Sequence, residues 1–259
     1  MTQHIDDTLV EAWFAAWSRS RGYTTRQDGS ERAALRRRRA SRPGTSAPTT
    51  TAPAAEGVWE HILVNPSAER LRQAAERLRQ SPEELVTVFG QTEQDPAEAG
   101  LHAATEAERL MSVELDPELI DVEPPILPEG YEARLDEPME GVRRLRLVAV
   151  DASTAPEGEE ELAGLGWVTF QEGTAVFDRI WTAPNHRRRG LGTMIMRHLT
   201  AEAMSAQDGL EQGLLVASPD GQKLYGHLGW TDLGPVTVWT LSDEDDATTQ
   251  AEHSGTMRR

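Results

Sequence analysis

The sequence contains no cysteine among its 259 residues, which excludes disulfides, thiolate nucleophiles and cysteine-ligated metal centres. Lysine is almost as rare: Lys223 is the only lysine among the 26 basic residues, so all the others are arginines. Aromatic residues make up 5% and hydrophobic residues 38% of the chain, which is low for a uniformly packed globule. We therefore expect part of the chain to be unstructured.

Long apolar runs are also missing, and no stretch approaches the roughly 20 apolar residues that a membrane-spanning helix needs. The first residues, MTQHIDD, lack the basic region and apolar run of a secretory signal, so we expect a cytoplasmic protein without a membrane partner. The formal net charge of −17 argues against a nucleic-acid partner, because phosphates would be repelled. The bias toward Arg, Ala and Glu is typical of a GC-rich bacterial genome.

The N-terminal segment predicts a helix followed by a disordered linker. From Asp6 to Ser20 apolar side chains recur at helical spacing, which indicates an amphipathic helix within residues 1–25. Trp13 and Trp17 on this helix form either a ligand-stacking pair or a core stripe, and the core stripe is favoured. Residues 26–56 are rich in Ser, Thr, Pro and Ala and predict a disordered linker. Its basic run, Arg36–Arg39, either docks on an acidic surface or is solvated, and solvation is favoured.

Residues 57–117 follow the order strand, helix, strand, helix, strand, which predicts a small α/β half-domain. The expected strands cover 58–64, 84–90 and 109–115, and the expected helices cover 68–78, with Ser67 as N-cap, and, more weakly, 95–106. No catalytic constellation is visible in this segment. A linker is expected over 118–129, because proline interrupts both helices and strand ladders, and this segment contains Pro124, Pro125 and Pro128.

Residues 130–241 are richer in strands. The pattern predicts helices over 189–205 and 219–227, and strands over 131–137, 142–150, 162–170, 174–182, 211–217, near 230 and over 236–241. The acidic tail 242–259 is predicted to be disordered. The whole pattern predicts an α+β fold, in which a mixed, mostly antiparallel central sheet is flanked by helices.

The stretch Ile180–Gly192, IWTAPNHRRRGLG, leads from a strand through a glycine-containing turn into a helix. Such a helix start presents unpaired N–H groups and the positive end of the macrodipole. Gly190 and Gly192 allow close approach, so a phosphate fits on the amides of residues 188–193, and Arg187–Arg189 add positive charge. The GxGxxG and GxxxxGK[ST] nucleotide motifs are absent. The alternative is a helix start whose glycines serve packing and whose arginines serve solubility.

A second motif, DGQKLYGHLGW, follows after a helix, a strand and another helix. Together the two resemble the GNAT superfamily of acetyl-CoA-dependent N-acetyltransferases, whose loop reads Arg/Gln-x-x-Gly-x-Gly/Ala and whose later motif reads roughly Ala-x-x-Leu-Tyr-x-x-x-Gly-Phe. Arg187, Gly190 and Gly192 match the first motif. The second, with Gly for Ala and Trp for Phe, is matched by Gly221, Leu224, Tyr225, Gly229 and Trp230. The resemblance covers residues 130–241, and the whole chain looks like actinobacterial two-part members with a degenerate GNAT-like N-terminal half.

The resemblance implies a catalytic GNAT domain over 130–241, with acetyl-CoA as co-substrate and no metal. The pantetheine arm is expected along the strand at Ile180, Trp181 and Thr182, with further coenzyme contacts from Ser218 and Gln222. The phosphates are expected on the loop formed by Arg187, Arg188, Arg189, Gly190, Leu191, Gly192 and Thr193. Tyr225 is expected to protonate the coenzyme A thiolate, since a phenol of pKa ~10 is protonated at neutral pH; the alternative is a core tyrosine.

An alkylammonium acceptor must lose a proton before it attacks, and Asp178 is the leading candidate base. Strand alternation predicts that Asp178 shares a face with Val176, Ile180 and Thr182. The alternative, about equally supported, is an aspartate paired with a nearby arginine. Weaker candidates for the base are His186, His198 and His227.

Two departures from the family pattern are visible. The frequent Asn seven residues before the tyrosine is Ser218 here, which still suits a helix start. The two helices that the family places between its first two strands are missing, so the N-terminal half is expected to wall the acceptor pocket.

The sequence thus predicts transfer of an acetyl group to a primary amine, of a small molecule or a peptide, by direct attack in a ternary complex. A GNAT-like scaffold that binds acyl-CoA without turnover is the alternative, and the presence of Tyr225 favours the enzyme. An adaptor function of the arginine run has only composition in its favour. A homodimer is compatible with the sequence, which does not indicate the oligomeric state.

Overall fold

The computed structural model describes residues 4–29, 31–37, 57–105, 107–116, 123–150 and 161–241. The helices are α1 (Asp7–Arg21), α2 (Ala68–Gln80), α3 (Leu191–Ala206) and α4 (Pro219–His227), with short 3₁₀ turns η1 (Pro96–Ala99) and η2 (Pro184–His186). The strands are β1 (Thr24–Asp28), β2 (Glu31–Arg37), β3 (Gly57–Val64), β4 (Leu85–Phe89), β5 (His102–Ala103), β6 (Glu108–Glu114), β7 (Tyr131–Met139), β8 (Val142–Ala149), β9 (Glu161–Gln171), β10 (Thr174–Thr182), β11 (Gln212–Ala217) and β12 (Thr231–Thr240).

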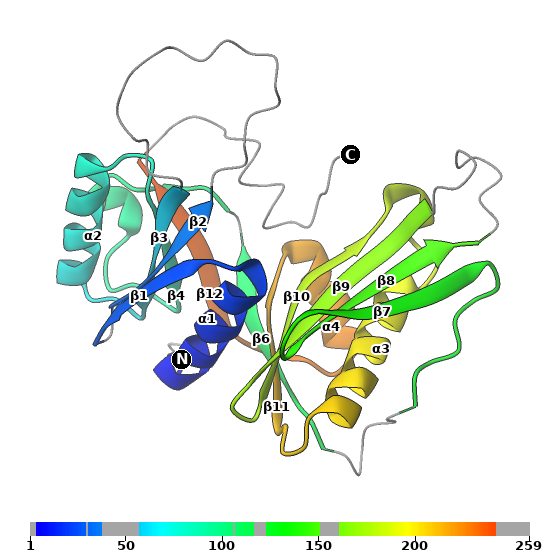
Figure 1. Ribbon diagram of the computed structural model, residues 1–259. Helices are drawn as coiled ribbons and strands as arrows, with labels where there is room; N and C mark the ends of the chain where they lie inside the picture. Colours follow the sequence, from blue (N-terminus) through cyan, green and yellow to red (C-terminus); the bar gives the residue numbers. More distant parts are fainter. Residues whose placement is uncertain are drawn as a thin grey trace, which may run out of the picture.

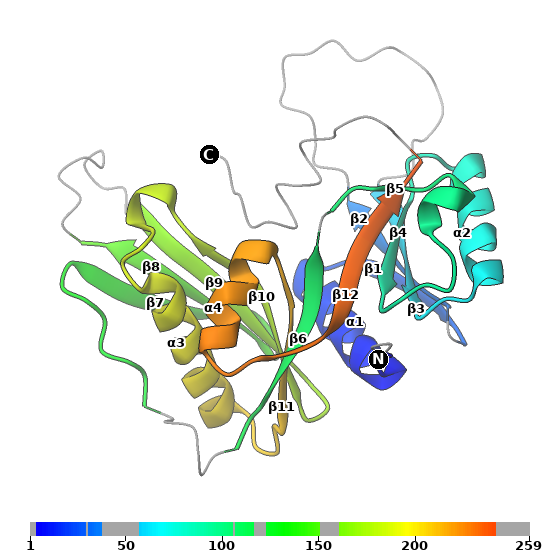
Figure 2. The same cartoon turned by 180° about the vertical axis from the view of Figure 1, so that it is seen from behind.

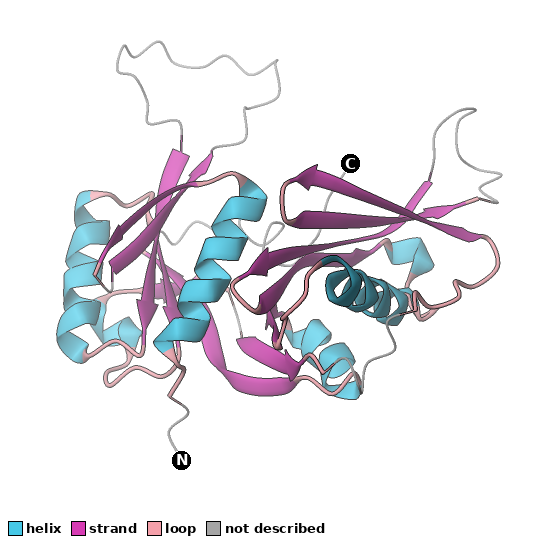
Figure 3. Cartoon of the chain, turned by 60° about the horizontal axis from the view of Figure 1, so that its bottom comes forward, coloured by secondary structure: helices cyan, strands magenta, loops and turns pink. Residues whose placement is uncertain are grey.

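All of these strands belong to one twelve-stranded mixed sheet. Its order is β1-β2-β3-β4-β12-β6-β11-β10-β9-β8-β7, and β5 pairs with β12 beside this path. Two neighbouring pairs, β3 with β4 and β10 with β11, are parallel, and the remaining pairs are antiparallel. Helices lie on both sides of the strands (Figure 3). The α+β fold with a mostly antiparallel sheet is therefore confirmed.

The two halves of the chain repeat one plan around an exchange of strands. In each half a helix connects two parallel neighbours: β3-α2-β4 in the first and β10-α3-β11 in the second. Beside β4 lies β12 of the second half, and beside β11 lies β6 of the first half. The boundary predicted over 118–129, of which residues 118–122 lie outside the described residues, does not divide the sheet, because each half supplies a strand that covers the open edge of the other.

Helix α1 packs on one face where the halves meet (Figure 1). Asp6 caps its first turn, and it ends at Gly22, whose φ of 64° continues the chain in the left-handed region. Trp13 and Trp17 are buried in a core with residues of both halves, and their rings stack with centroids 5.0 Å apart. The core-stripe interpretation of the two tryptophans is thereby confirmed.

Helices α3 and α4 lie on the opposite face, as the view from behind shows (Figure 2). Helix α3 approaches β8, β9 and β10 closely. Gly164 and Gly166 of β9 permit this, since a Cβ on Gly166 would lie 2.6 Å from Cγ2 of Ile195. Leu191, Ile195 and Leu199 of α3 are fully buried in a second hydrophobic core, which is formed by α3, α4 and this face of the sheet. The second core therefore fixes where α3 begins.

Three predictions for the N-terminal half need correction. The expected linker over 26–56 begins with strands β1 and β2, and residues 38–56 lie outside the described residues, as does the tail 242–259. Arg36 is not solvated: it is buried in β2 and lies 3.2 Å from the buried carboxylate of Glu60. The weak helix over 95–106 is only the turn η1 followed by β5, and Pro96 sits at its first position.

Candidate functional site

Strands β10 and β11 separate after a short parallel ladder. They pair only from Thr174–Gln212 to Val176–Leu214, although β10 continues to Thr182 and β11 continues to Ala217. Along its other edge β11 pairs with β6 through its whole length. The inner edges of the two parallel strands therefore present main-chain groups beyond Val176 that no neighbouring strand of the described sheet pairs with.

The equivalent place in the N-terminal half is closed. Strands β3 and β4 stay paired to their ends, at Val64 and Phe89. The turn after β3 is filled by Asn65, whose amide nitrogen donates to the carbonyl oxygen of Ile5 at 2.7 Å. A Cβ on Gly90 would lie 2.1 Å from Oδ1 of Asn65, so the space is tightly occupied. Only the C-terminal half, of these two, offers a splayed pair of strands.

The turn that opens α3 presents free backbone amides. Gly190 is the N-cap of α3, with φ of 77° and no side-chain cap, and Arg188 also has a positive φ, of 62°. Within the described part of the chain, no backbone amide from Arg188 to Thr193 donates a hydrogen bond. Residues with positive φ beside a helix start can turn neighbouring N–H groups toward one point, which forms an anion-binding concavity. A Cβ built on Gly190 meets no heavy atom within 4 Å, so the turn is open at this residue.

A hydrogen-bonded chain holds this turn in place. Arg189 donates to the phenol oxygen of Tyr131 at 2.9 Å. The phenol lies 2.9 Å from Nδ1 of His186, whose Nε2 lies 3.0 Å from Glu161. His186 is buried, and Arg187 donates to the carbonyl of Thr182. Sequence reasoning missed Tyr131 and Glu161, because no spacing signals that residues on β7 and β9 support a turn after β10.

Tyr225 lies on α4, on the same face as α3. Its side chain is buried in the second core, with the ring centroid 6.0 Å from that of Trp230. Burial raises the pKa of the Tyr225 phenol well above its usual value, and the negative charge of Asp178 raises it further. A Cβ on Gly221 would lie 2.9 Å from Cε2 of Tyr225, so the ring packs closely against the first turn of α4.

A β-bulge in β10 overturns the predicted face of Asp178. Asp178 pairs with Trp167 and Trp181 pairs with Leu165, so two residues on β10 oppose one on β9. Arg179 within the bulge has φ of 54°. Asp178 therefore faces α1, whereas Ile180 packs in the α3 core and Thr182 lies near Gly192. Alternation predicted one shared face, and the extra residue reverses it beyond Asp178.

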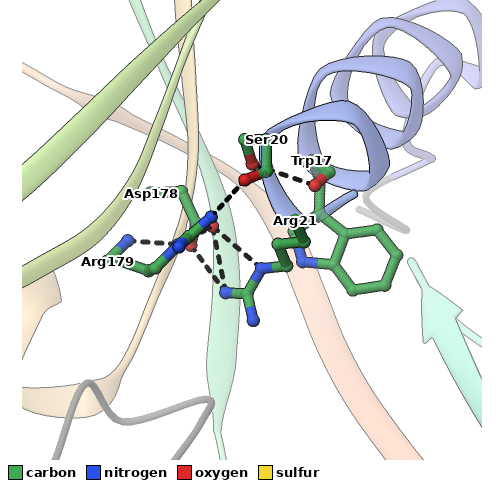
Figure 4. A network of polar contacts seen from close by, with 5 residues as sticks. All are labelled: Trp17, Ser20, Arg21, Asp178 and Arg179. Carbon is green, nitrogen blue, oxygen red and sulfur yellow. Dashed lines mark hydrogen bonds and ion pairs between the residues drawn. The ribbon is translucent and has the colours of Figure 1, made fainter. Parts of the chain in front are cut away.

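Asp178 is held by two arginines (Figure 4). Nε and Nη2 of Arg21 donate to its two carboxylate oxygens at 3.0 Å each, and the amide of Arg179 donates to it at 2.8 Å. Desolvation opposes ionisation, but the charges of Arg21 and Arg179 prevail and lower the pKa of Asp178. The interpretation of Asp178 as an arginine-paired aspartate thus describes the structure, and the geometry gives no support to it as a free base.

The same network ties α1 to the bulge. Arg179 donates through Nη2 to the carbonyl of Ser20 at 2.7 Å, and its guanidinium lies 4.0 Å from the ring centroid of Trp167. Arg19 of α1 donates to the carbonyl of Phe170. The last turn of α1 therefore lies against β9 and β10, on the face opposite α3.

The other residues that were predicted to contact the coenzyme lie on β10, at the start of α3 and at or on α4. Trp181 packs beside Trp167. Leu191 is fully buried, so only its amide is available to a ligand, whereas Gly192 and Thr193 continue the first turn of α3. Ser218 caps α4 by accepting from the amide of Gly221 at 3.3 Å, as expected. Gln222 donates to the carbonyl of Ala107 at 2.6 Å, which joins α4 to the N-terminal half.

The histidines do not form a base at the splay. His186 belongs to the chain that holds the turn. Burial lowers the pKa of His198 on α3, and Nδ1 of His227 donates to the carbonyl of Lys223 within α4. Among the described residues no cluster of acids and histidines suits a metal ion, and no described helix is long and apolar enough to span a membrane.

Comparison with known proteins agrees with this geometry. Residues 147–232 match the model of the acetyltransferase (GNAT) domain, a segment that contains the turn at Gly190 and Tyr225. No curated protein sequence matches the chain. A GCN5-related N-acetyltransferase from Kribbella flavida aligns with 95% of this chain and 98% of its own, with a TM-score of 0.60 and 13% identity.

Two further solved structures are similar in outline. A tandem GNAT protein from the clavulanic acid biosynthesis pathway is 17% identical, with coverage of 83% of this chain and 80% of its own and a TM-score of 0.49. A GCN5-related N-acetyltransferase from Sphaerobacter thermophilus is 12% identical, with coverage of 92% and 94% and a TM-score of 0.48. The Kribbella likeness establishes the fold, and the family match covers the segment with the free amides. Residues 147–232 therefore contain a segment that matches the GNAT acetyltransferase domain, within a chain that has the fold of the Kribbella protein.

Proposed function

We propose that this chain transfers an acetyl group from acetyl-CoA to a primary amine, by direct attack of the amine in a ternary complex. The observation that carries the proposal is the coincidence of three features in one half of the molecule. Strands β10 and β11 splay, the amides from Arg188 to Thr193 are free, and Tyr225 lies on the same side of the sheet. The closed equivalent in the N-terminal half supports a site in the C-terminal half.

The residues of the turn fit the diphosphate of coenzyme A. Amides without partners at a helix start attract an anion, and the absent side chain of Gly190 leaves room for close approach. Arg187 and Arg188 are exposed beside them and add positive charge. The pantetheine arm would pair with the free edge of β10 between Ile180 and Thr182.

The same edge would stabilise the reacting carbonyl. A backbone N–H of the splayed strand that faces the thioester oxygen would stabilise the charge that develops as the amine attacks, an effect worth about 3 kcal/mol per donor. Tyr225 would then give its proton to the departing thiolate. Its raised pKa keeps the phenol protonated at every ordinary pH, as an acid in this step requires.

Among the described residues near the bulge, no side chain is free to act as a strong base. Asp178 is engaged by Arg21 and Arg179, and its lowered pKa makes it a weak proton acceptor. The acceptor amine would instead lose its proton to water. The two arginines assist, because positive charge nearby disfavours an ammonium and so lowers the pKa of the amine.

The engagement of Asp178 is also the observation that favours a second candidate, a scaffold that binds acyl-CoA without turnover. The two functions differ in whether free thiol appears. Purified protein would be mixed with acetyl-CoA and a panel of amines, and thiol release would be followed with a disulfide reagent. We expect release that depends on both amine and protein; tight coenzyme binding with no release for any amine would establish the binding scaffold instead.

A further inference from the structure

On the face of the sheet that carries α1, two clusters of described residues hold more arginines than acids. Asp136 of β7 binds Arg144 of β8 and lies 3.9 Å from Arg146, and Asp178 binds two arginines as described above. Each aspartate thus serves two arginines. These two clusters keep an excess of positive charge, although the chain as a whole carries a net charge of −17.

Trp167 joins the two clusters into one surface. In the strand register Arg144 lies opposite Trp167, and Trp167 lies opposite Asp178, so the three side chains form a row across β8, β9 and β10. The Trp167 ring centroid is 5.3 Å from Cζ of Arg144 and 4.0 Å from Cζ of Arg179. One indole is therefore flanked by a guanidinium from each cluster.

Unpaired hydrogen-bond donors gather on this surface. Trp167 is 9% exposed, and its Nε1 is buried without a partner in the described part of the chain. Trp181 packs beside it, and its indole nitrogen is also buried without a partner among the described residues. The same holds for Nε of Arg146. The carboxylates within reach, Asp136 and Asp178, are already engaged. Because a buried donor without an acceptor costs free energy, the surface suits a ligand that brings acceptor oxygens.

This surface lies across the sheet from the turn at Gly190 and from Tyr225. Asp178, at one end of the row, lies two residues beyond Val176, the last residue of β10 that pairs with β11, so the surface borders the splay. A coenzyme held by the amides of α3 occupies the α3 side. An acceptor would therefore approach the thioester from the side of Trp167 and the arginines.

We propose that this surface binds the carboxylate of the acceptor, so that the enzyme acts on amines that carry a carboxylate. The inference rests on the proposed function and names its substrate class. Planar guanidinium groups and indole N–H donors match a carboxylate, which accepts several hydrogen bonds in one plane. The net positive charge of the two clusters supplies the attraction.

The test compares ω-amino carboxylates with alkylamines of the same chain length, whose amines have similar pKa values, together with the matching aminophosphonates. We expect kcat/KM to be at least about tenfold higher for the carboxylates, as for loss of one charged hydrogen bond. Arg146→Gln and Trp167→Phe should each reduce this preference. Arg197→Gln, an exposed site on α3, is the matched control and should leave it unchanged. Equal rates for carboxylates and alkylamines, or a preference for phosphonates, would overturn the proposal.

A binding measurement separates this inference from the proposed function. Carboxylates that lack an amine would be titrated into the protein in the presence of coenzyme A, and tryptophan fluorescence would be followed. We expect saturable binding that Trp167→Phe and Arg146→Gln both weaken by about tenfold, and that Arg197→Gln leaves alone. If no amine is ever acetylated, the enzyme proposal fails while this titration still decides the surface. Absence of saturable binding, or binding indifferent to both variants, would refute the carboxylate site.

Discussion

The ion pair between Arg21 and Asp178 connects helix α1 to the bulge of strand β10. Both side chains are at most 20% exposed, so removing one partner leaves the other charged and poorly solvated. We expect Asp178→Asn to lower the free energy of unfolding by about 3 kcal/mol, measured by denaturant titration. Arg21→Met should cost a similar amount, and the double variant should cost clearly less than the sum of the two.

The exposed pair Arg72 and Glu69 on α2 gives the matched control, because its partners are 61% and 58% exposed. Removing either should change the free energy of unfolding by less than about 0.5 kcal/mol.

The pair at Asp178 also predicts a pH dependence. The pKa of Asp178 is lowered on folding. The contribution of the ion pair to the free energy of unfolding is therefore complete above the unfolded pKa of about 4, and it is lost as pH falls through the folded pKa. Additive effects in the double variant would show that the pair is not coupled.

Tyr225 predicts the shape of the pH–rate profile. Its raised pKa keeps the phenol protonated well into the alkaline range, and Asp178 stays ionised across neutral pH. We expect kcat/KM to rise with pH as the acceptor amine loses its proton, without a descending limb up to about pH 10. A fall in rate near pH 9 would place a different acid in the reaction.

Replacing Tyr225 by Phe removes the hydroxyl and keeps the ring that packs against Trp230. We expect kcat to fall by about 10²–10⁴-fold while the affinity for acetyl-CoA, measured by calorimetry, stays near that of the unchanged protein. Unchanged turnover would remove Tyr225 from the mechanism and leave it a core tyrosine.

At the scale of one residue, the sequence indicated the turn at Gly190 and the position of Tyr225 but not what surrounds them. Gly190 and Tyr225 belong to local patterns that survive without tertiary information. The partner of Asp178 is 157 residues away in the chain, on a helix that packs across the sheet. No local spacing encodes that contact, so only the general possibility of an arginine partner was within reach.

At the scale of the element, helix α3 depends on the glycines of β9 beneath it. A Cβ on Gly166 would approach Cγ2 of Ile195 to 2.6 Å and Cδ1 of Leu199 to 2.8 Å. We expect Gly166→Ala to lower the free energy of unfolding by about 1–3 kcal/mol, through overpacking. Thermal unfolding followed by circular dichroism would measure it.

The control for that change is Gly226→Ala in α4, where a Cβ meets nothing within 4 Å and the backbone is helical. It should be neutral or stabilising, by up to about 1 kcal/mol, because alanine favours helices. If Gly166→Ala were equally harmless, α3 would not sit as closely on β9 as the packing implies.

Most elements follow from local pattern, and their irregularities do not. The bounds predicted for 174–182 and 219–227 are those observed for β10 and α4, because alternation, turns and the Ser218 cap mark both ends. The bulge at Arg179 broke the alternation from within the strand, and only its pairing with β9 reveals it. Strand β2 was hidden in the same way, since a short strand rich in alanine and arginine resembles a linker until it pairs with β3.

At the scale of the whole molecule, the exchange of β6 and β12 makes the halves interdependent. Strand β6 lies between β12 and β11 of the second half, and β12 lies between β4 and β6 of the first half. Either half alone would therefore leave strand edges uncovered. We expect fragments 1–116 and 123–259, produced separately, to be insoluble or unfolded, and to form a soluble complex when produced together. Two fragments that each gave a cooperative unfolding transition would show that the halves are autonomous.

The sequence predicted only in part how the two halves differ in their proposed roles. Composition and the motifs placed the chemistry in residues 130–241, and the resemblance suggested a degenerate repeat in the first half. That α1 lies against the second half follows from packing: a helix at the start of the chain lies on β9, β10 and β11. Long-range placement of this kind is set by burial of Trp13 and Trp17 among residues of both halves.

The central claim is that one splayed pair of strands and one free turn bind the coenzyme. Calorimetric titration with coenzyme A tests it most directly, with Gly190→Gln compared with Gly209→Gln, a glycine of similar positive φ and equally open surroundings in the loop after α3. We predict one coenzyme A per chain, binding abolished in Gly190→Gln, and binding retained in Gly209→Gln. Two sites per chain, or equal affinity in the Gly190 variant, would contradict the account.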